Sequence, residues 1–396
     1  MVIGDGTYIK KMNRDLILQE IFTQKKISRA NLSKKTGLNK ATISSQVGDL
    51  IKDHFIFETQ EKHSGLGRRP ILLSINEESA YFLGIDLDYE NILFNVMNLK
   101  GDTVLFEKVD LFSDIYEEIV ELLANKISQY KTIFADSTYG LAQVTIGIHG
   151  TVSTDETIYF IPKYQWREKD LKKDLMARGI KNVYIENNAN LSAYAEKVFY
   201  YHQSNHLLNI TLSTGIGAGI IINGNLQKGY NGHAGEIGHM IVYPKGRPCR
   251  CGNEGCWERY ASEPALLNRA KHVLPVNISS HADLEKLVDN RDKDAIKVIN
   301  DWLADVSIGL NNIINIYNPE MIVLNSPILN FYPHALEELD KHLVSSVSNY
   351  HKIAVSELGG KAGVVGACAI GIQRFMGLPQ LSLLGTNNIT VNEANL

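Results

Sequence analysis

Apolar residues recur at helical spacing in three short segments between residues 12 and 52. In the first segment they form one stripe, made of Leu16, Ile17, Ile21 and Phe22. Ser28 stands where an N-cap begins a second helix, and Gly37 stands where that helix ends. In the third segment the apolar residues share one helix face and are Ile43, Val47, Leu50 and Ile51. Two short helices about a glycine-containing turn predict a helix-turn-helix, and a plain helical hairpin is the alternative.

The polar side of the third segment carries side chains that can hydrogen-bond to base edges in a major groove. Two strand-like runs follow, FIFETQ and PILLSIN, on either side of the glycine-rich loop EKHSGLGRR. A loop with paired arginines is typical of a wing that contacts phosphates or a narrow minor groove. We therefore predict a winged helix-turn-helix over residues 1–79, with operator DNA as its partner. The candidate DNA contacts are Arg29, Asn39, Lys40, Thr42, Ser45, Gln46, Arg68 and Arg69.

Beyond residue 79 strand-like runs alternate with helical ones. We predict strands with a turn at KGD in YFLGIDLDYENILFNVMNLKGDTVLFEKVD. We predict a helix in YEEIVELLANKISQY and a further strand in QVTIGIHG. A comparable unit begins at NHLLNITLSTGIGAGIIINGNLQKG. The alternation predicts an α/β domain over residues 80–376, with two related lobes and a cleft between them. We expect the lobes at roughly 80–187 together with a C-terminal helix, and at 188–362. Residues 377–396 are expected to be a loosely held tail.

Composition and charge narrow the class of protein. The chain has 396 residues, of which 44% are hydrophobic, and no apolar run reaches the roughly 18 residues of a membrane span. The polar first 15 residues lack a signal-peptide core, so we expect a cytoplasmic protein without a membrane partner. The net charge is −4, yet residues 1–75 contain 13 Lys and Arg against 7 Asp and Glu. This basic excess suits a polyanionic partner for the N-terminal part, although a solvated charged face is the alternative.

Three of the four cysteines lie close together in HAGEIGHMIVYPKGRPCRCGNEGCWE, residues 233–258. Cys249, Cys251 and Cys256 are an odd set with short spacing, which does not suit a disulfide framework. Three thiols and one nearby imidazole are the ligand set of a tetrahedral zinc site, and His239 supplies the imidazole. A closed site with four protein ligands is structural, so we predict a zinc ion that holds this loop. The alternative is a cysteine-rich surface loop without metal.

The helix pair, the glycine-rich loop, the two lobes and the elements GEIGH and CRCGNEGCWE together resemble the ROK family of repressors and sugar kinases. The resemblance runs from about residue 12 to about residue 376. Within the family, TYIKKMNRDLILQEIF, ISRANLSKKTGLNKATISSQV and GRRP are most similar to the xylose operon repressors of Gram-positive bacteria. The resemblance implies a winged helix-turn-helix followed by a two-lobed, actin-like and sugar-kinase-like α/β domain with a zinc knuckle.

The resemblance also implies which residues contact a sugar, namely Asn187, Asn188, Glu236, His239 and Glu258. Carboxylates and amides in a cleft offer the acceptors and donors that a polyol requires. His239 would bind zinc through one ring nitrogen and leave the other for the sugar. For Glu236 and Glu258 the alternative is an ordinary solvated loop carboxylate.

Several positions depart from the family's kinases. Asn188 stands in place of the catalytic aspartate, and an amide cannot act as a general base near neutral pH. Residues 86–90, DLDYE, replace the phosphate loop D-x-G-x-T, and Asn325 and Ser326 replace a later glycine pair. Only the glycines of the 215–219 segment retain a phosphate loop's pattern, and nucleotide binding there stays an open alternative. We therefore expect no enzymatic activity and no ATP.

The expected function is a homodimeric or larger repressor that a sugar inducer, xylose or a related sugar, releases from its operator. The alternatives are a kinase or bifunctional kinase and regulator, and a repressor controlled by a protein partner. Two further departures leave the sugar open. His149 replaces the proline of a G-x-P-G turn, and Lys163 replaces an asparagine. Lys163 would favour a phosphorylated or acidic sugar if it faces the cleft, or else pack its stem over Trp166.

Overall fold

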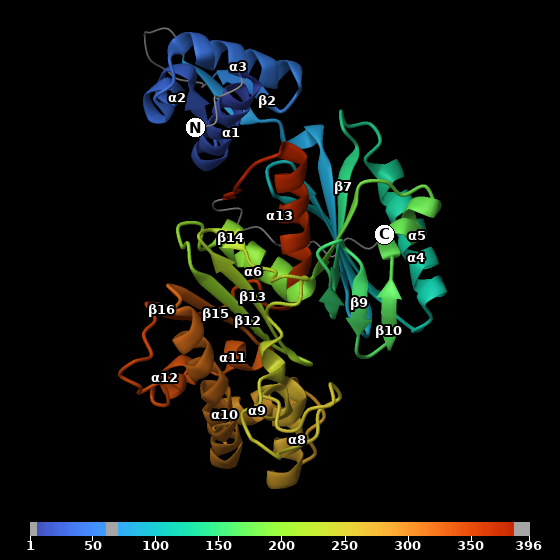
Figure 1. Ribbon diagram of the computed structural model, residues 1–396, viewed down its shortest axis with the longest axis vertical. Helices are drawn as coiled ribbons and strands as arrows, with labels where there is room; N and C mark the ends of the chain where they lie inside the picture. Colours follow the sequence, from blue (N-terminus) through green and yellow to red (C-terminus); the bar gives the residue numbers. More distant parts are fainter. Residues whose placement is uncertain (1–5, 61–69, 384–396) are drawn as a thin grey trace.

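The N-terminal domain consists of three helices and a small antiparallel sheet in this computed structural model, which describes residues 6–60 and 70–383 (Figure 1). The helices are α1 (Gly6–Gln24), α2 (Arg29–Thr36) and α3 (Lys40–Lys52). The strands are β1 (Ile27–Ser28), β2 (Ile56–Gln60) and β3 (Ile71–Ile75), in the order β1-β3-β2. The expected helix pair and both expected strands are therefore present, whereas the loop between the strands, with Arg68 and Arg69, lies outside the described residues.

Local hydrogen bonds set the helix boundaries of this domain. The Ser28 hydroxyl accepts a hydrogen bond from the Asn31 amide, and Gly37 ends α2 with a φ of 73°, as the sequence predicted. The predicted α1 stripe is partly wrong, because Leu16 is exposed and Leu18 is fully buried in its place. Neighbouring elements decide which residues of a helix are buried, and helical spacing in the sequence locates the edge of the buried face only to within one position.

The first lobe is built on a five-stranded sheet with the order β11-β7-β4-β5-β6. Strands β4, β7 and β11 are parallel, whereas β5 and β6 are antiparallel additions at one side. Helices α4 and α5 lie over one face of the sheet (Figure 1). The bounds are β4 (Tyr81–Leu87), β5 (Asn91–Asn98), β6 (Thr103–Asp110), α4 (Tyr116–Ile133), β7 (Leu141–Ile148), α5 (Leu171–Ala177) and β11 (Val183–Asn187). A separate small sheet contains β8 (Thr151–Val152), β9 (Ile158–Ile161) and β10 (Trp166–Lys169).

The second lobe repeats this arrangement with a sheet of order β14-β13-β12-β15-β16. Its strands are β12 (Leu207–Leu212), β13 (Ile216–Ile222), β14 (Asn225–Leu226), β15 (Met321–Asn325) and β16 (Lys352–Val355). Its helices are α7 (Glu258–Ala261), α8 (Glu263–Val273), α9 (His281–Asp289), α10 (Lys293–Tyr317), α11 (Pro327–Phe331) and α12 (Ala335–Asp340). Short 3-10 turns occupy Glu77–Ser79, Ile237–His239 and Gly359–Lys361. Within the described ranges, none of the helices has both the length and the apolar character needed to span a bilayer.

Two helices join the lobes. Helix α6 (Asn188–Phe199) packs against β12 and β13 of the second sheet, and α13 (Ala362–Met376) packs against α6 and against β4 and β7 of the first (Figure 1). The close packing of α6 on β13 requires glycine, because a Cβ at Gly219 would lie 2.3 Å from the Ala189 carbonyl oxygen. The expectation of a loosely held tail is wrong for residues 377–383, because Leu378, Leu381 and Leu383 are buried.

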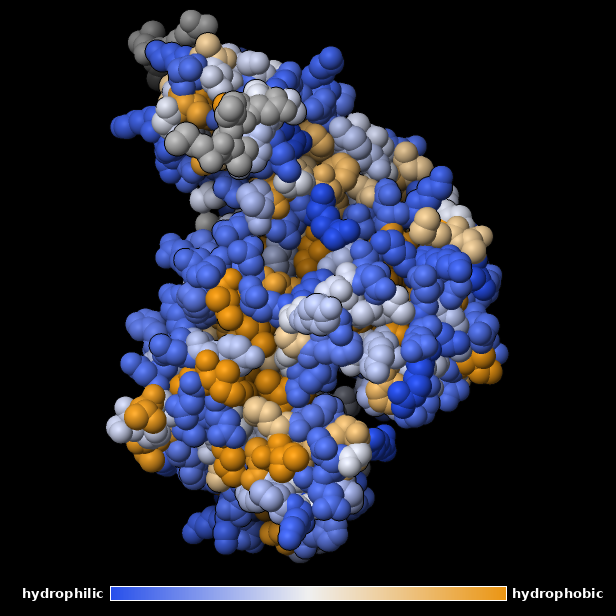
Figure 2. Space-filling model, in the orientation of Figure 1, coloured by the Kyte–Doolittle hydropathy of each residue, from blue (hydrophilic) through white to orange (hydrophobic). Residues whose placement is uncertain are grey.

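The surface shows how the apolar side chains are distributed. The face drawn in Figure 2 is mainly hydrophilic, and the apolar residues on it lie in separate groups. Most large apolar side chains are instead in the cores of the lobes and of the N-terminal domain. These cores fix the relative positions of the loops that carry the candidate site.

Candidate functional site

Four predicted metal ligands converge in the loop before α7. The ligand atoms of His239, Cys249, Cys251 and Cys256 all lie within 4.8 Å of one another. The Cys251 and Cys256 sulfurs are 3.6 Å apart, and the Cys249 sulfur is 3.7 Å from His239 Nδ1. Metal bonds of about 2.0–2.3 Å in a tetrahedron separate the ligand atoms by about 3.3–3.8 Å. The four side chains are therefore near enough to hold one metal ion, and thiolates with an imidazole suit zinc.

The two candidate sugar-binding glutamates lie on either side of the His239 ring. Glu258 Oε1 is 3.7 Å from His239 Nδ1 and accepts a hydrogen bond of 3.0 Å from the Cys249 thiol. Glu236 Oε2 is 4.0 Å from the other ring nitrogen, Nε2. The surrounding protein partly desolvates the Glu236 carboxyl and raises its pKa although the side chain is 42% exposed, while His239, His233 and a hydrogen bond from Thr151 oppose that rise. The structure thus brings Glu236, His239 and Glu258 together beside the metal ligands, with Nε2 facing away from the thiols.

Asn187 and Asn188 lie at the start of α6, and both side chains have protein partners. Asn187 caps the helix, since its Oδ1 accepts from the Asn190 amide at 3.2 Å while its Nδ2 donates to the Gly150 carbonyl at 2.9 Å. Asn188 is buried, and its Nδ2 donates to Asp86 Oδ1 at 2.8 Å. Their contacts to a sugar remain predictions. The sequence showed neither partner, because Asp86 and Asn188 are 102 positions apart.

His149 forms an ion pair with the same carboxylate. Its Nε2 lies 2.8 Å from Asp86 Oδ1, and its Nδ1 lies 3.8 Å from Asp88 Oδ1. Burial alone would lower the pKa of His149, but the attraction of Asp86 and Asp88 raises it to about 9. The imidazole is therefore protonated at neutral pH. One buried oxygen, Asp86 Oδ1, thus holds both the cation and the Asn188 amide.

Tyr89 lies next to His149 and within electrostatic reach of the glutamates beside the metal ligands. Its hydroxyl donates to the His149 carbonyl at 2.9 Å. Burial raises the pKa of Tyr89, and the charges of Asp88, Glu258 and Glu236 add to that rise. The Lys163 ammonium is 5.0 Å from the centre of the Tyr89 ring, which places its charge over that ring. The same ammonium donates to the Tyr89 carbonyl at 3.3 Å, so the charge of Lys163 is held at Tyr89, while the packing of its stem over Trp166 stays a prediction.

Comparison with known proteins places this geometry in a family. The model of the ROK family matches residues 82–374. The chain belongs to the ROK family. It is 37% identical to the xylose repressor of Bacillus subtilis (strain 168) over 381 residues, which cover 95% of this chain and 99% of that protein. The resemblance predicted from the sequence is confirmed.

Solved structures of the ROK family match the fold. A ROK family transcriptional regulator, described as a homolog of the E. coli MLC protein, superposes with a TM-score of 0.79 at 25% identity. The match covers 93% of this chain and 98% of that one. A ROK glucokinase from Streptomyces griseus, solved with glucose and AMPPNP, superposes with a TM-score of 0.65 at 27% identity. That match covers 73% of this chain and 98% of the kinase.

The positions at which this ROK chain departs from kinase motifs have structural roles. Asn325 Nδ2 donates to the Gly359 carbonyl at 2.8 Å, and the Ser326 hydroxyl accepts from the Ile328 amide at the start of α11. Gly217 and Gly219 lie within β13, where they face α6. Gly217 and Gly219 therefore have a packing reason that is independent of any phosphate.

The candidate DNA contacts of α3 divide into exposed and engaged side chains. Lys40 and Ser45 are exposed, and Thr42 is half-buried. Placing Gln46 on the polar side was wrong, since it is only 5% exposed and its position, three residues after buried Ile43, belongs to the core face of α3. A side chain buried against its own domain is not available to a base edge.

Two further candidate DNA contacts are engaged within the N-terminal domain. The Asn39 side chain caps α3, where it accepts from the Thr42 amide at 2.8 Å. Arg29 pairs with Glu58 of β2 at 2.8 Å. Both side chains remain accessible at the surface, so their contacts to DNA stay predictions, but each already has a role in shaping the domain.

Proposed function

We propose that this chain is a transcriptional repressor that binds operator DNA as a dimer and is released by a sugar, xylose or a related pentose. The observation that carries the proposal is the extent of the similarity to the Bacillus subtilis xylose repressor. The similarity spans 95% of the chain, so it includes the N-terminal domain as well as the two lobes. A kinase of this family needs no such N-terminal domain, and the match to the solved glucokinase covers only 73% of this chain.

The N-terminal domain acts as a winged helix-turn-helix in this proposal. Helix α3 lies after a tight turn at Gly37 and presents Lys40 and Ser45 to the outside. A single recognition helix reads only a few base pairs, so two copies on a two-fold symmetric operator are required for specificity. Arg68 and Arg69, on the loop between β2 and β3, would add contacts to phosphates or to the minor groove.

The sugar binds in the cleft at Glu236, His239 and Glu258, with Asn187 and Asn188 at its base. Zinc in the group formed by His239 and the three cysteines holds the loop that carries both glutamates. Its role is structural, because four protein ligands leave no open coordination position. His239 Nε2 remains free to hydrogen-bond to a sugar hydroxyl, because the thiols lie on the Nδ1 side.

Catalysis is not part of the proposed function. Residue 188 has an amide in place of a carboxylate, and that amide donates a hydrogen bond to Asp86. The side chain at the position of the kinase base is therefore a hydrogen-bond donor and cannot take the proton from the attacking sugar hydroxyl. Carboxylates Asp88 and Glu90, in the turn after β4, would repel the phosphates of a nucleotide.

Operator binding measured by fluorescence anisotropy, with a panel of pentoses, hexoses and sugar phosphates, tests the proposal. Xylose or a related sugar should weaken operator binding by the wild type. Glu236→Ala and Glu258→Ala should bind the operator normally but fail to release it. If only a sugar phosphate released the operator, the inducer would be a phosphorylated sugar, as the positive charge of Lys163 would favour. An operator affinity that no sugar or sugar phosphate alters would overturn the proposal in favour of control by a protein partner.

A further inference from the structure

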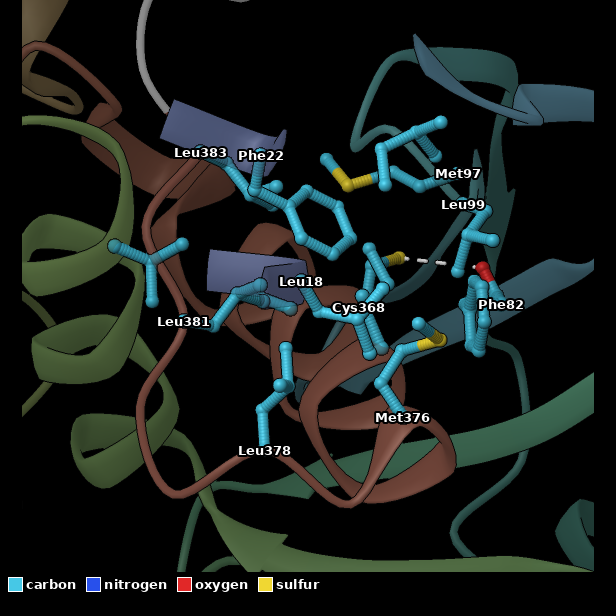
Figure 3. Close-up of a cluster of buried hydrophobic side chains, with 14 of the residues drawn as sticks. Leu18, Phe22, Phe82, Met97, Leu99, Cys368, Met376, Leu378, Leu381 and Leu383 are labelled. Atoms are coloured by element: carbon cyan, nitrogen blue, oxygen red, sulfur yellow. Dashed lines mark hydrogen bonds between the residues drawn. The ribbon is translucent and has the colours of Figure 1, made fainter. Parts of the chain in front are cut away.

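The last described residues, Gly377–Leu383, form a strap that runs from the end of α13 along the N-terminal domain. Three leucines of the strap, at positions 378, 381 and 383, are each 5% exposed or less. They belong to the same buried cluster as Leu18 and Phe22 of α1 (Figure 3). Pro379 and Gln380 between them are exposed. The strap is therefore held by an apolar inner side that packs between α1 and the body of the protein.

Hydrogen bonds attach the strap to both of its neighbours. On the side of α1, Gln19 Nε2 donates to the Gln380 carbonyl oxygen at 3.4 Å. Just before the strap, Arg14 Nη1 donates to the Met376 carbonyl at 3.1 Å. On the side of the lobes, the Leu383 amide donates to the Val198 carbonyl at 3.0 Å. Val198 belongs to the last turn of α6, so the strap connects α6 with α1.

Helix α6 begins at the candidate sugar site. Asn188 is its first residue and Asn187 its N-cap, whereas Val198 lies near its other end. A helix of 12 residues is about 18 Å long and moves as a rigid element. The helix also packs on the second lobe through β12 and β13. Because the Leu383 amide is bonded to Val198, a change in the angle between the lobes that moves the Val198 end of α6 also moves that amide.

The N-terminal domain has a second attachment to the body, made of aromatic rings from the last turn of α13 and from the segment before β7. Phe55, in the turn after α3, stacks on Tyr139 with ring centres 5.3 Å apart and meets the edge of Phe375 at 5.8 Å. The Tyr139 hydroxyl donates to the Asp53 carbonyl at 2.8 Å. One attachment alone leaves a domain free to rotate about it, whereas two fix its orientation. The aromatic contact is thus a pivot, and the strap determines the angle at this pivot.

We propose that the strap transmits the sugar state of the cleft to the N-terminal domain. The inference rests on the proposed function and adds the route by which the site controls DNA binding. In the sugar-free state, the leucines of the strap hold α1 in the orientation that lets both recognition helices of a dimer contact one operator. When sugar changes the angle between the lobes, α6 moves Leu383, the strap leaves its position on α1 and the N-terminal domain rotates about Phe55.

The test compares two truncations of the full chain, one that ends at Leu383 and one that ends at Gly377. Operator affinity is measured by fluorescence anisotropy with and without sugar, and sugar affinity by calorimetry. The variant that ends at Leu383 should behave as the wild type does. The variant that ends at Gly377 should bind sugar normally, bind the operator at least tenfold more weakly than the wild type, and respond to sugar less than twofold.

Point variants keep the test valid if the shorter truncation unfolds. Leu381→Ala shortens a buried leucine of the strap, and Gln380→Ala is the matched control because its side chain is exposed and the Gln19 bond is made to the backbone oxygen of Gln380. Leu381→Ala should reduce the sugar response and Gln380→Ala should not, with folding of both checked by thermal unfolding. A folded Leu381→Ala variant that releases DNA as the wild type does would overturn the inference alone. A wild type that ignores every sugar would overturn the proposed function and the inference with it.

Discussion

Replacing Asn188 by aspartate restores the carboxylate of the family's kinases, and we expect it to destabilise the fold without producing activity. In the wild type the Asn188 amide donates to Asp86 Oδ1 at 2.8 Å, and both residues are buried. Asn188→Asp exchanges this donor for a second carboxylate. Two like charges at hydrogen-bond distance in a buried site cannot both be ionised without cost, so the pKa of the new carboxyl rises above its ordinary value.

The size of the effect has two parts. Loss of the amide donor leaves a buried carboxylate oxygen with one partner fewer, which costs about 1–3 kcal/mol. Each unit by which the new carboxyl's pKa rises costs about 1.4 kcal/mol more near neutral pH. The protonated His149 beside Asp86 offsets part of this repulsion. We therefore expect a loss of about 2–5 kcal/mol near neutral pH, a large share of the roughly 5–15 kcal/mol that stabilises a typical domain.

The loss should depend on pH in one direction. A carboxyl whose pKa is raised by folding binds its proton more tightly in the folded state, so folding is penalised as pH rises through the folded pKa. Below the unfolded pKa of about 3.9 both states are protonated, and the new carboxyl can donate its proton to Asp86. The destabilisation should therefore be smallest near pH 4 and reach its full size near neutral pH.

Urea unfolding of Asn188→Asp and wild type, between pH 4 and pH 8, measures this difference. Asn31→Asp, at an exposed position of α2, is the control for a change of amide to carboxylate and should alter stability little at any pH. Assays with ATP and sugar should detect no sugar phosphate from either protein. A variant as stable as the wild type at neutral pH would refute the reasoning about Asp86, and sugar phosphate formation would refute the reasoning about catalysis.

Three other predictions concern the ion pair, the metal and the DNA. His149→Gln should remove stability that is complete below pH 6.5 and lost as pH rises through about 9, on the order of 3 kcal/mol, so its unfolding curve should differ from that of the wild type at pH 6 more than at pH 9.5. Cys251→Ser should lose bound zinc, measured by metal analysis, and lose the sugar response with it. Metal analysis that finds no zinc in wild-type protein purified without chelator would contradict this expectation. Ser45→Ala should reduce discrimination between operator and random DNA, whereas Gln46→Ala should lower the melting temperature and leave discrimination unchanged. If Gln46→Ala instead reduced the discrimination between operator and random DNA, Gln46 would have to be a DNA contact.

Some expectations depended only on neighbouring residues, and these could be predicted from the sequence. The limits of α2, at Ser28 and Gly37, could be predicted because both signals are local. A cap involves an amide three residues away, and a left-handed φ belongs to a single residue. The convergence of the four candidate metal ligands could be predicted for a related reason, since three of them lie within eight residues and short turns bring them together. Alternation of strand and helix patterns was enough to predict the two α/β lobes.

Other features depended on contacts between distant segments, and only the tertiary structure decided them. Gln46 occupies a core position because neighbouring elements cover that face of α3, and periodicity does not reveal how wide the covered face is. The side chains of Asn188 and His149 meet at Asp86 because α6 begins, and β7 ends, beside the end of β4, which depends on the order of strands in the sheet.

The strap gives the clearest case of this difference. Its sequence, GLPQLSL, mixes three leucines with glycine, proline, glutamine and serine and has no helix or strand pattern. Nothing local therefore predicts that its leucines are buried. They are buried because α1 and the first lobe leave an apolar surface that this segment covers. Hydrogen bonds within a few residues are encoded by the local sequence. The burial of a side chain is encoded by whichever distant segment packs against it, and that is known only once the chain is folded.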